Sequence, residues 1–240
     1  MVQGNTYVIG DVHGELSALR ALIDNLKIKP HDKIIFLGDC VDKGPQTRET
    51  LDYLLGLSNK IQTVFIKGNH EEMMLAAIGG NKRAQHFWLK HGGQETLQSY
   101  GVKTICELDK VLPREHRAFL EQAVDAYITE SHVFVHASWD TRKKQEHQTV
   151  KTLRYRFMNA SYPNKKFGKT IVCGHSSLIS GKPAVRGNFL CIDTVEFGWL
   201  TALDLKCGRF IQANSNGDIR RIKRAEQFSQ KKHVPKQFHI

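Results

Sequence analysis

The first seventy residues alternate between short apolar runs and longer stretches in which apolar residues recur every three or four positions. Apolar runs that stop at a glycine are typical of buried strands, and the longer spacing is typical of amphipathic helices. The pattern predicts strands over 6–10, 33–38 and 62–68, and helices over 15–26 and 47–57. This alternation indicates parallel βαβ units, in which right-handed crossovers bring the loops after the strands to one edge of the sheet.

The period of the pattern changes in the rest of the chain. Residues 71–126 have helical spacing, and Pro113 suits the first turn of a helix. From Tyr127 onward the pattern is strand-like, with apolar runs at 132–137, 170–175, 189–194, 199–205 and 209–214. Strands that follow one another late in a chain favour a second sheet packed on the first.

Composition and cysteine usage narrow the class of protein. The chain has 240 residues, 40% of them hydrophobic and 25% charged, as in ordinary soluble globular proteins. It contains no apolar run of the roughly 18 residues that a membrane span needs, and its start does not resemble a signal peptide. The five cysteines are scattered without a C-x-x-C pair, so we expect reduced thiols and a cytoplasmic protein.

The net charge of +11 is unevenly distributed. Residues 219–240 contain seven Lys or Arg and one Glu, whereas residues 1–218 are much closer to neutral. We therefore expect one domain over 1–218 followed by a basic tail over 219–240. Such a tail could contact nucleic acid or an anionic surface, but a solvated terminus is the simpler interpretation.

Polar residues follow five of the predicted strands, and all but one lysine have side chains that can bind metal. They are Asp11 and His13, then Asp39, Asp42 and Lys43, then Asn69 and His70, and finally His136 and His175. Mixed oxygen and imidazole ligands suit divalent ions such as Mn²⁺, Fe²⁺ or Zn²⁺. The supply exceeds the needs of one ion and favours a two-metal site of the kind that hydrolyses phosphate esters, with Asp39 as the shared ligand.

The motifs "GDVHG", "GDCVDKGP" and "GNHE", followed by strand-end histidines, resemble those of the calcineurin-like metallophosphoesterases. More narrowly, they resemble the phosphoprotein phosphatases, in particular the bacterial and phage serine/threonine enzymes, over about residues 5–212. The resemblance implies a βαβαβ α/β fold in which two mixed sheets pack as a sandwich flanked by helices. It also implies two divalent metal ions, for which Mn²⁺ is the expected choice and Fe or Zn the alternatives.

The resemblance also implies roles for the matching residues. Six would bind metal: Asp11 and His13 the first ion, Asp39 both ions, and Asn69, His136 and His175 the second ion. His70 would be the general acid that protonates the leaving group, and Asp42 would orient its imidazole by a hydrogen bond.

Three residues are candidates for binding the substrate phosphate. Asn69 is one, and Lys43 is another, although protein phosphatases usually have arginine at that position. Arginine grips phosphate through two parallel hydrogen bonds, whereas lysine is a point charge. A lysine here resembles the diadenosine-tetraphosphatase-like relatives. The third candidate is Arg154 in "TLRYRF", with Arg156 as the fallback.

These features lead to three hypotheses. The first is a monomeric phosphatase acting on phosphoserine and phosphothreonine proteins, with phosphotyrosine as a further substrate, by attack of a hydroxide that bridges two metals. The second is a pyrophosphohydrolase of dinucleoside polyphosphates or capped RNA ends, which Lys43 favours. The third is an inactive scaffold that binds nucleic acid through the basic tail; the presence of all six ligands and His70 argues against it.

Overall fold

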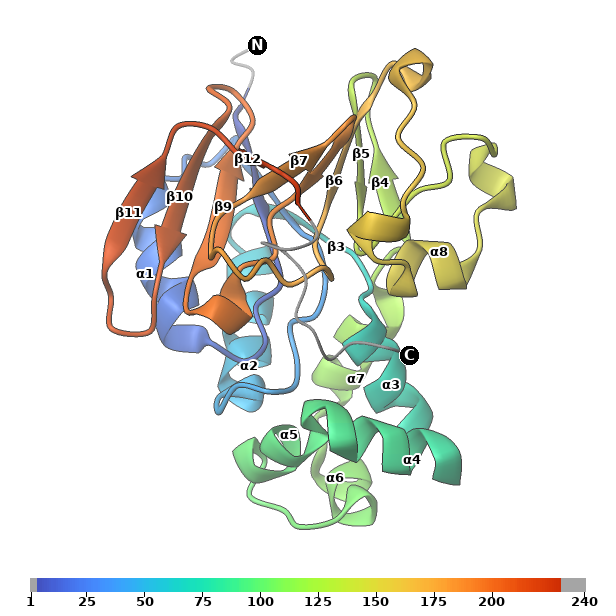
Figure 1. The fold of residues 1–240 in the computed structure, drawn as a ribbon. Coiled ribbons are helices and arrows are strands. Elements are labelled where there is room, and N and C mark those ends of the chain that lie inside the picture. Colours follow the sequence, from blue (N-terminus) through green and yellow to red (C-terminus); the bar gives the residue numbers. More distant parts are fainter. Residues whose placement is uncertain (1–3, 230–240) are drawn as a thin grey trace.

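The computed structural model describes residues 4–229, and its first sheet contains the predicted βαβαβ segment (Figure 1). The strands β1 (Thr6–Ile9), β2 (Lys33–Phe36) and β3 (Gln62–Phe65) are parallel and are joined by α1 (Leu16–Leu26) and α2 (Thr47–Ser58). The sheet continues from β1 through the antiparallel strands β9 (Leu200–Asp204), β10 (Arg209–Ala213) and β11 (Ile219–Ile222). The loops that follow the parallel strands β1, β2 and β3 therefore lie at one edge of the sheet, as the pattern predicts.

The second sheet has the order β12-β7-β8-β6-β5-β4. Its strands are β4 (Ala126–Ile128), β5 (His132–Val135), β6 (Thr170–Cys173), β7 (Ala184–Arg186), β8 (Phe189–Cys191) and β12 (Glu226–Gln227). The central strands β5, β6 and β8 are parallel, whereas β4 and β7 are antiparallel to their neighbours. Both sheets are thus mixed, and the predicted fold class is confirmed.

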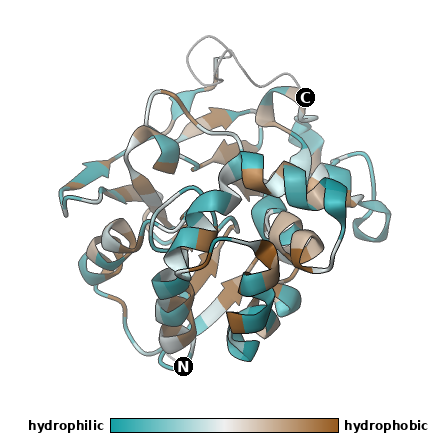
Figure 2. Ribbon diagram, turned by 90° about the horizontal axis from the view of Figure 1, so that it is seen from below, coloured by the Kyte–Doolittle hydropathy of each residue, from teal (hydrophilic) through white to brown (hydrophobic). Residues whose placement is uncertain are grey.

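Alternating side chains explain why the two sheets form a sandwich. In β2, Ile34 and Phe36 pack against the helical layer, whereas Ile35 packs between the sheets. Phe134 of β5 and Val172 of β6 reach the same inter-sheet core from the other side. Successive strand residues point to opposite faces, so a run that is apolar at every position is buried on both. Figure 2 shows hydrophobic residues concentrated on the strands between the helices, whereas the helices carry both hydrophilic and hydrophobic residues.

The helical middle of the chain forms a separate layer at one end of the sandwich (Figure 1). It consists of α3 (Asn69–Ile78), α4 (Lys82–Trp88), a π-helical turn (Leu89–Gly93), α5 (Gln94–Ser99), α6 (Ile105–Val111) and α7 (Arg114–Gln122). Their apolar faces surround the fully buried Trp88. A further helix, α8 (Val150–Tyr155), and short 3₁₀ turns at Gln145–His147, Met158–Ala160, Lys165–Phe167 and Val195–Phe197 lie outside this layer.

The segment assigned to the basic tail extends the sheets in its described part. Ile219 pairs with Ala213 across β10 and β11, and both Ile219 and Ile222 pack on apolar cores. Residues 230–240, which carry three of the lysines, lie outside the described residues. All five cysteines are free thiols. Among the helices of residues 4–229, none is long and apolar enough to cross a membrane.

Candidate metal centre and active site

The loops that follow the central strands of both sheets meet in one cleft of about 580 Å³. Within residues 4–229, six non-glycine residues have positive φ, and five are predicted site residues: His13, Asp39, Asp42, Lys43 and His175. Left-handed backbone costs a non-glycine residue on the order of 1–3 kcal/mol and persists only where the surroundings hold it. Here the amides of Val12 and His13 both donate to the Asp39 carbonyl oxygen, at 3.0 and 2.8 Å. The strain thus lies where the side chains must converge.

Two groups of three potential ligands share Asp39. His13, Asp39 and His70 form one triplet, and Asp39, His136 and His175 form the other, with the ligand atoms of each within 4.8 Å of one another. The Asp39 Oδ2 atom lies 3.7 Å from His13 Nε2 and 3.4 Å from His136 Nε2. A carboxylate between two histidine groups is suited to bridge two cations, as expected for Asp39.

Backbone carbonyls orient the imidazoles. His13 Nδ1 lies 2.9 Å from the Val41 carbonyl oxygen, and His136 Nδ1 lies 2.8 Å from that of Leu37. A carbonyl only accepts, so each Nδ1 carries the proton and each Nε2 presents its lone pair to the cleft. An outer hydrogen bond of this kind fixes the tautomer of a metal-binding histidine.

Asn69 joins the second triplet. Its Oδ1 atom lies 2.9 Å from His136 Nε2 and 2.8 Å from His175 Nδ1. One amide oxygen and two imidazole nitrogens therefore converge, as the ligand set of one divalent ion requires. Burial, with His136 next in effect, lowers the pKa of His175 to about 3, so this imidazole is neutral and able to bind metal.

Asp11 lies in the same cleft but belongs to neither triplet of the described residues. Its carboxylate accepts the His175 amide proton at 3.1–3.2 Å. Burial and then the Asp193 and Asp39 carboxylates raise the pKa of Asp11 well above its usual value. Buried carboxylates that repel one another in this way match a site whose cations supply the missing positive charge.

Charged neighbours determine the protonation of Asp39. Burial would raise the pKa of Asp39, but the His136 and His70 imidazoles outweigh it and hold the pKa well below its usual range. The pKa of His13 is lowered well below its usual value by burial and by the Lys43 ammonium. The ionised Asp39 carboxylate and the neutral His13 and His175 imidazoles are donors that Mn²⁺, Fe²⁺ or Zn²⁺ prefers, so these residues fit divalent cations.

His70 and Asp42 form the predicted pair, with His70 Nδ1 2.8 Å from Asp42 Oδ2. Burial would lower the pKa of His70, but the Asp39 charge and the Asp42 hydrogen bond outweigh it and raise the pKa. Asp42 is fully buried and also accepts hydrogen bonds from Trp88 Nε1 at 2.9 Å and Thr96 Oγ1 at 2.7 Å. The imidazole is therefore held with Nε2 towards the cleft, where a proton donor belongs.

Glu71 holds the site together without facing the cleft. Its carboxylate accepts from the amides of Asp39, Cys40 and Gly68 at 2.9, 2.6 and 2.8 Å. Glu71 is in the first turn of α3, so its carboxylate fastens the β2 loop to the helix that begins with Asn69. The position of Glu71 at a helix start was the only sequence signal for this role.

Lys43 is at the edge of the cleft. Its Nζ atom lies 3.1 Å from His13 Nε2 and forms an ion pair with Glu196. Beside Glu196, the buried Asp193 has its pKa raised to about 7 by burial and by the Glu196 charge. Sequence reasoning missed both acids, although Asp193 follows β8 as the other site residues follow their strands.

The structure does not bring the predicted arginines into the cleft. Arg154 and Arg156 are outside the set of described residues that line it. The Arg154 guanidinium pairs with Glu72 at 2.7 Å and with Asp125. Arg156 donates to the Ala160 carbonyl oxygen at 3.3 Å. Lys43 and Asn69, in contrast, line the cleft as expected of phosphate-binding residues.

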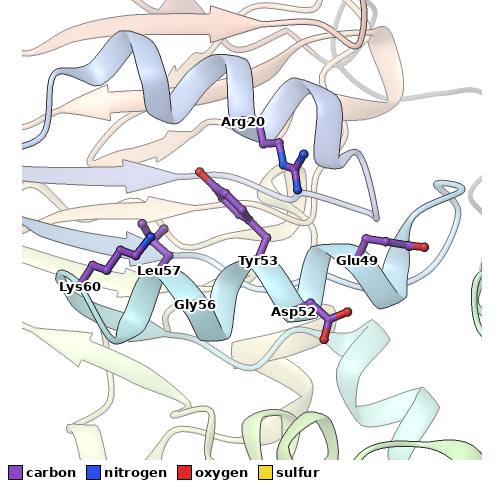
Figure 3. Close-up of a pocket in the computed structure, with 7 residues that line it drawn as sticks. All are labelled: Arg20, Glu49, Asp52, Tyr53, Gly56, Leu57 and Lys60. Atoms are coloured by element: carbon purple, nitrogen blue, oxygen red, sulfur yellow. The ribbon is translucent and has the colours of Figure 1, made fainter.

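A second cavity, of about 440 Å³, shares no lining residue with the cleft around Asp39. It lies between α1 and α2, where Arg20 of α1 faces Tyr53 of α2 (Figure 3). Its lining contains both cations and carboxylates, and none of the predicted metal ligands. The cleft around Asp39 is therefore the candidate active site.

Comparison with known proteins agrees with this geometry. A family model described as calcineurin-like phosphoesterase matches residues 4–201. The chain belongs to the calcineurin-like phosphoesterase family. Members of this family use a dinuclear divalent metal centre, and the two triplets that share Asp39 are groups that could hold such ions.

Curated relatives that share one name match parts of the chain. A protein of Methylococcus capsulatus named symmetrical bis(5′-nucleosyl)-tetraphosphatase is 41% identical over 81 residues, which cover 33% of this chain and 28% of the relative. A protein of the same name from a Marinomonas species is 30% identical over 142 residues, covering 58% of this chain and 48% of the relative. The chain thus spans less than half the length of these curated relatives.

Solved structures show the same fold at lower identity. A putative diadenosine tetraphosphatase matches with a TM-score of 0.63 at 18% identity, covering 89% of this chain and 94% of the other. A cold-active protein tyrosine phosphatase matches with a TM-score of 0.65 at 15% identity, covering 91% and 78%. Since proteins named for anhydride and for ester substrates share this fold, the fold alone does not select the bond that is cleaved.

Proposed function

We propose that this calcineurin-like phosphoesterase hydrolyses the phosphoanhydride chain of dinucleoside polyphosphates and releases nucleoside diphosphates. The observation that carries the proposal is the sequence similarity, up to 41% identity, to proteins named symmetrical bis(5′-nucleosyl)-tetraphosphatases. The lysine at position 43 supports the same substrate class.

The position of Lys43 suits a chain of phosphates. Its ammonium lies 3.1 Å from His13 Nε2 and one third of its side chain is exposed, so it reaches from the metal ligands towards the cleft mouth. A compact ammonium on a flexible stem binds phosphoryl oxygens without a fixed orientation, whereas a planar guanidinium binds two oxygens of one phosphate at a fixed angle. An incoming phosphate would compete with Glu196 for this cation.

His70 supplies the proton that the reaction needs. With Nδ1 bonded to Asp42, the imidazole presents Nε2 to the cleft, 3.9 Å from Asp39 Oδ2. It would donate from Nε2 to the bridging oxygen as the nucleoside diphosphate leaves, and Asp42 stabilises the imidazolium beforehand. When bound by Asp39 and the other ligands, two divalent ions supply neutralising charge at the phosphoryl oxygens and acidify water.

Phosphoprotein hydrolysis is the second candidate, and the buried His70–Asp42 pair favours it. A serine alkoxide is a poor leaving group and depends on a proton donor more than a phosphate does. If this candidate is correct, the substrate partner is a phosphorylated protein and Lys43 substitutes for the usual arginine.

Direct competition tests the proposal. Metal-stripped protein refilled with Mn²⁺ would be offered diadenosine tetraphosphate and a phosphoserine peptide, and kcat/KM would be measured for each. We expect kcat/KM to be at least tenfold higher for the dinucleotide. Lys43→Arg should reduce that preference, because a guanidinium binds two oxygens of a terminal phosphate. A preference for the peptide would overturn the proposal in favour of the second candidate.

A further inference from the structure

One part of the cleft mouth has no role in the chemistry described so far. Phe87, the last residue but one of α4, is 43% exposed although it is aromatic. Its ring packs on His91 with centroids 4.0 Å apart and planes inclined by 32°. Both residues line the cleft together with the metal ligands. The exposed Phe87 ring, backed by the half-buried His91 imidazole, offers a flat aromatic surface beside a polar cleft.

We propose that Phe87 and His91 form a stacking platform that binds one nucleobase of the substrate. The inference rests on the proposed function and deepens it, because it assigns a part of the cleft to the end of the substrate that is not cleaved. Every nucleobase presents a π face, and stacking on an aromatic side chain strengthens binding about ten- to hundred-fold.

The backbone holds this platform in a fixed position. His91 is on the π-helical turn Leu89–Gly93, and its Nδ1 atom lies 2.7 Å from the Phe87 carbonyl oxygen. The ring is therefore tied back to the residue on which it packs. The turn is a kink between α4 and α5, because the backbone of His91 (φ −114°) and Gly92 (φ +104°) is not helical.

The turn and the adjoining end of α4 each contact the loop that follows β2. The carbonyl oxygen of Gly92 accepts the Lys43 amide proton at 3.1 Å, and Trp88 Nε1 donates to Asp42. Gly92 has φ +104°, and a Cβ atom there would come within 2.6 Å of the Lys43 nitrogen. The platform is thus held at a constant distance from the phosphate-binding lysine, as recognition of a base at a set number of phosphates from the reacting one requires. Lys90 is exposed on this turn and lines the cleft, where it is placed to bind the phosphates that lie between the base and the reacting phosphate.

A phosphoserine peptide needs no such platform, so base recognition separates the two substrate classes. The probes would be 1,N6-ethenoadenosine diphosphate, whose fluorescence reports stacking, and pyrophosphate, which lacks a base. Affinities for both would be measured on the Mn²⁺-loaded full chain. The variants would be Phe87→Ala, His91→Ala and the conservative Phe87→Tyr. Val124→Ala, an equally exposed apolar residue (43%) outside the cleft, is the matched control.

We expect Phe87→Ala to weaken binding of the etheno nucleotide ten- to hundred-fold and to leave pyrophosphate binding within twofold. His91→Ala should weaken it less, since His91 mainly supports the ring. Phe87→Tyr and Val124→Ala should match the wild type. Unchanged nucleotide affinity in Phe87→Ala, equal loss of both ligands, or no binding of the nucleotide by wild type would each overturn the platform. If the wild type binds the nucleotide in a base-dependent way but does not hydrolyse diadenosine tetraphosphate, the proposed function is refuted and the platform is not.

Discussion

Replacing Asp42 with asparagine would separate the positioning of the proton donor from the binding of metal. Asp42 is fully buried, and its carboxylate accepts from His70, Trp88 and Thr96. Asparagine has nearly the same shape, but it exchanges one acceptor oxygen for an NH₂ group that faces donors. None of the predicted metal ligands changes, so we expect the variant to fold, to bind metal and to fail as a proton donor.

The size of the effect follows from the contacts that are lost. The charge-assisted bond to His70 contributes about 1.5–3 kcal/mol, and a buried donor left unpaired costs about 1–3 kcal/mol. We therefore expect the free energy of unfolding to fall by roughly 3–5 kcal/mol, as when one partner of a buried ion pair is removed. General acid catalysis typically contributes about 10²–10⁴-fold, and this factor shrinks as the leaving group becomes more acidic.

The assay compares two aryl phosphates whose leaving groups differ in acidity. We expect Asp42→Asn to lower kcat for phenyl phosphate roughly 10²–10³-fold and for p-nitrophenyl phosphate less than tenfold. Bound metal would be counted by elemental analysis, and urea unfolding would give the stability. Asp140→Asn is the matched control: Asp140 is 3% exposed, pairs with Arg142 and lies outside the cleft, so kcat should not change. An equal loss of rate on both substrates would refute the assigned role of the His70–Asp42 pair.

Three further predictions concern the metals, the loop anchor and the π-helical turn. Mn²⁺ at 100 times its Kd should stabilise the wild type by about 2.7 kcal/mol, which a thermal melt would show as a rise in melting temperature. Asp39→Asn should lose this rise, whereas the exposed control Glu49→Gln should keep it. A retained rise in Asp39→Asn would contradict the bridging role. Glu71→Gln should lower the free energy of unfolding in urea by about 2–4 kcal/mol, because its NH₂ group would face backbone amides. The control Glu72→Gln breaks a partly exposed ion pair and should cost less than about 1 kcal/mol. Equal costs would refute the role of Glu71 in fastening the β2 loop to α3. Gly92→Ala should be less stable than Gly80→Ala, because both have positive φ (+104° and +87°) but only Gly92 adds a contact, at 2.6 Å from Lys43; equal melting temperatures would argue against close packing of the turn on the loop.

The features that could be predicted from the sequence are those encoded in short segments. An apolar run followed by Gly-Asp marks the end of β2, and the same pattern repeats after β1 and, with Asn69, after β3. Because strand ends in parallel sheets meet at one edge, this local signal was enough to place Asp39 among the histidines.

The contacts that could not be predicted join residues far apart in the chain. Trp88 and Asp42 are 46 positions apart, and nothing near either residue indicates their hydrogen bond. Arg154 matches a phosphate-binding motif by sequence, yet the packing of α8 brings it to Glu72, 82 positions away. Strand β11 was assigned to a basic tail because its charge, rather than Ile219 and Ile222, dominates the local composition.

The central claim, that the cleft around Asp39 hydrolyses a dinucleoside polyphosphate, is tested most directly by the products. Mn²⁺-loaded protein would be incubated with diadenosine tetraphosphate, and the nucleotides would be separated by anion-exchange chromatography. The account predicts adenosine diphosphate as the sole nucleotide product and its loss in Asp39→Asn. Intact dinucleotide, in a preparation that releases orthophosphate from a phosphoserine peptide, would contradict the account.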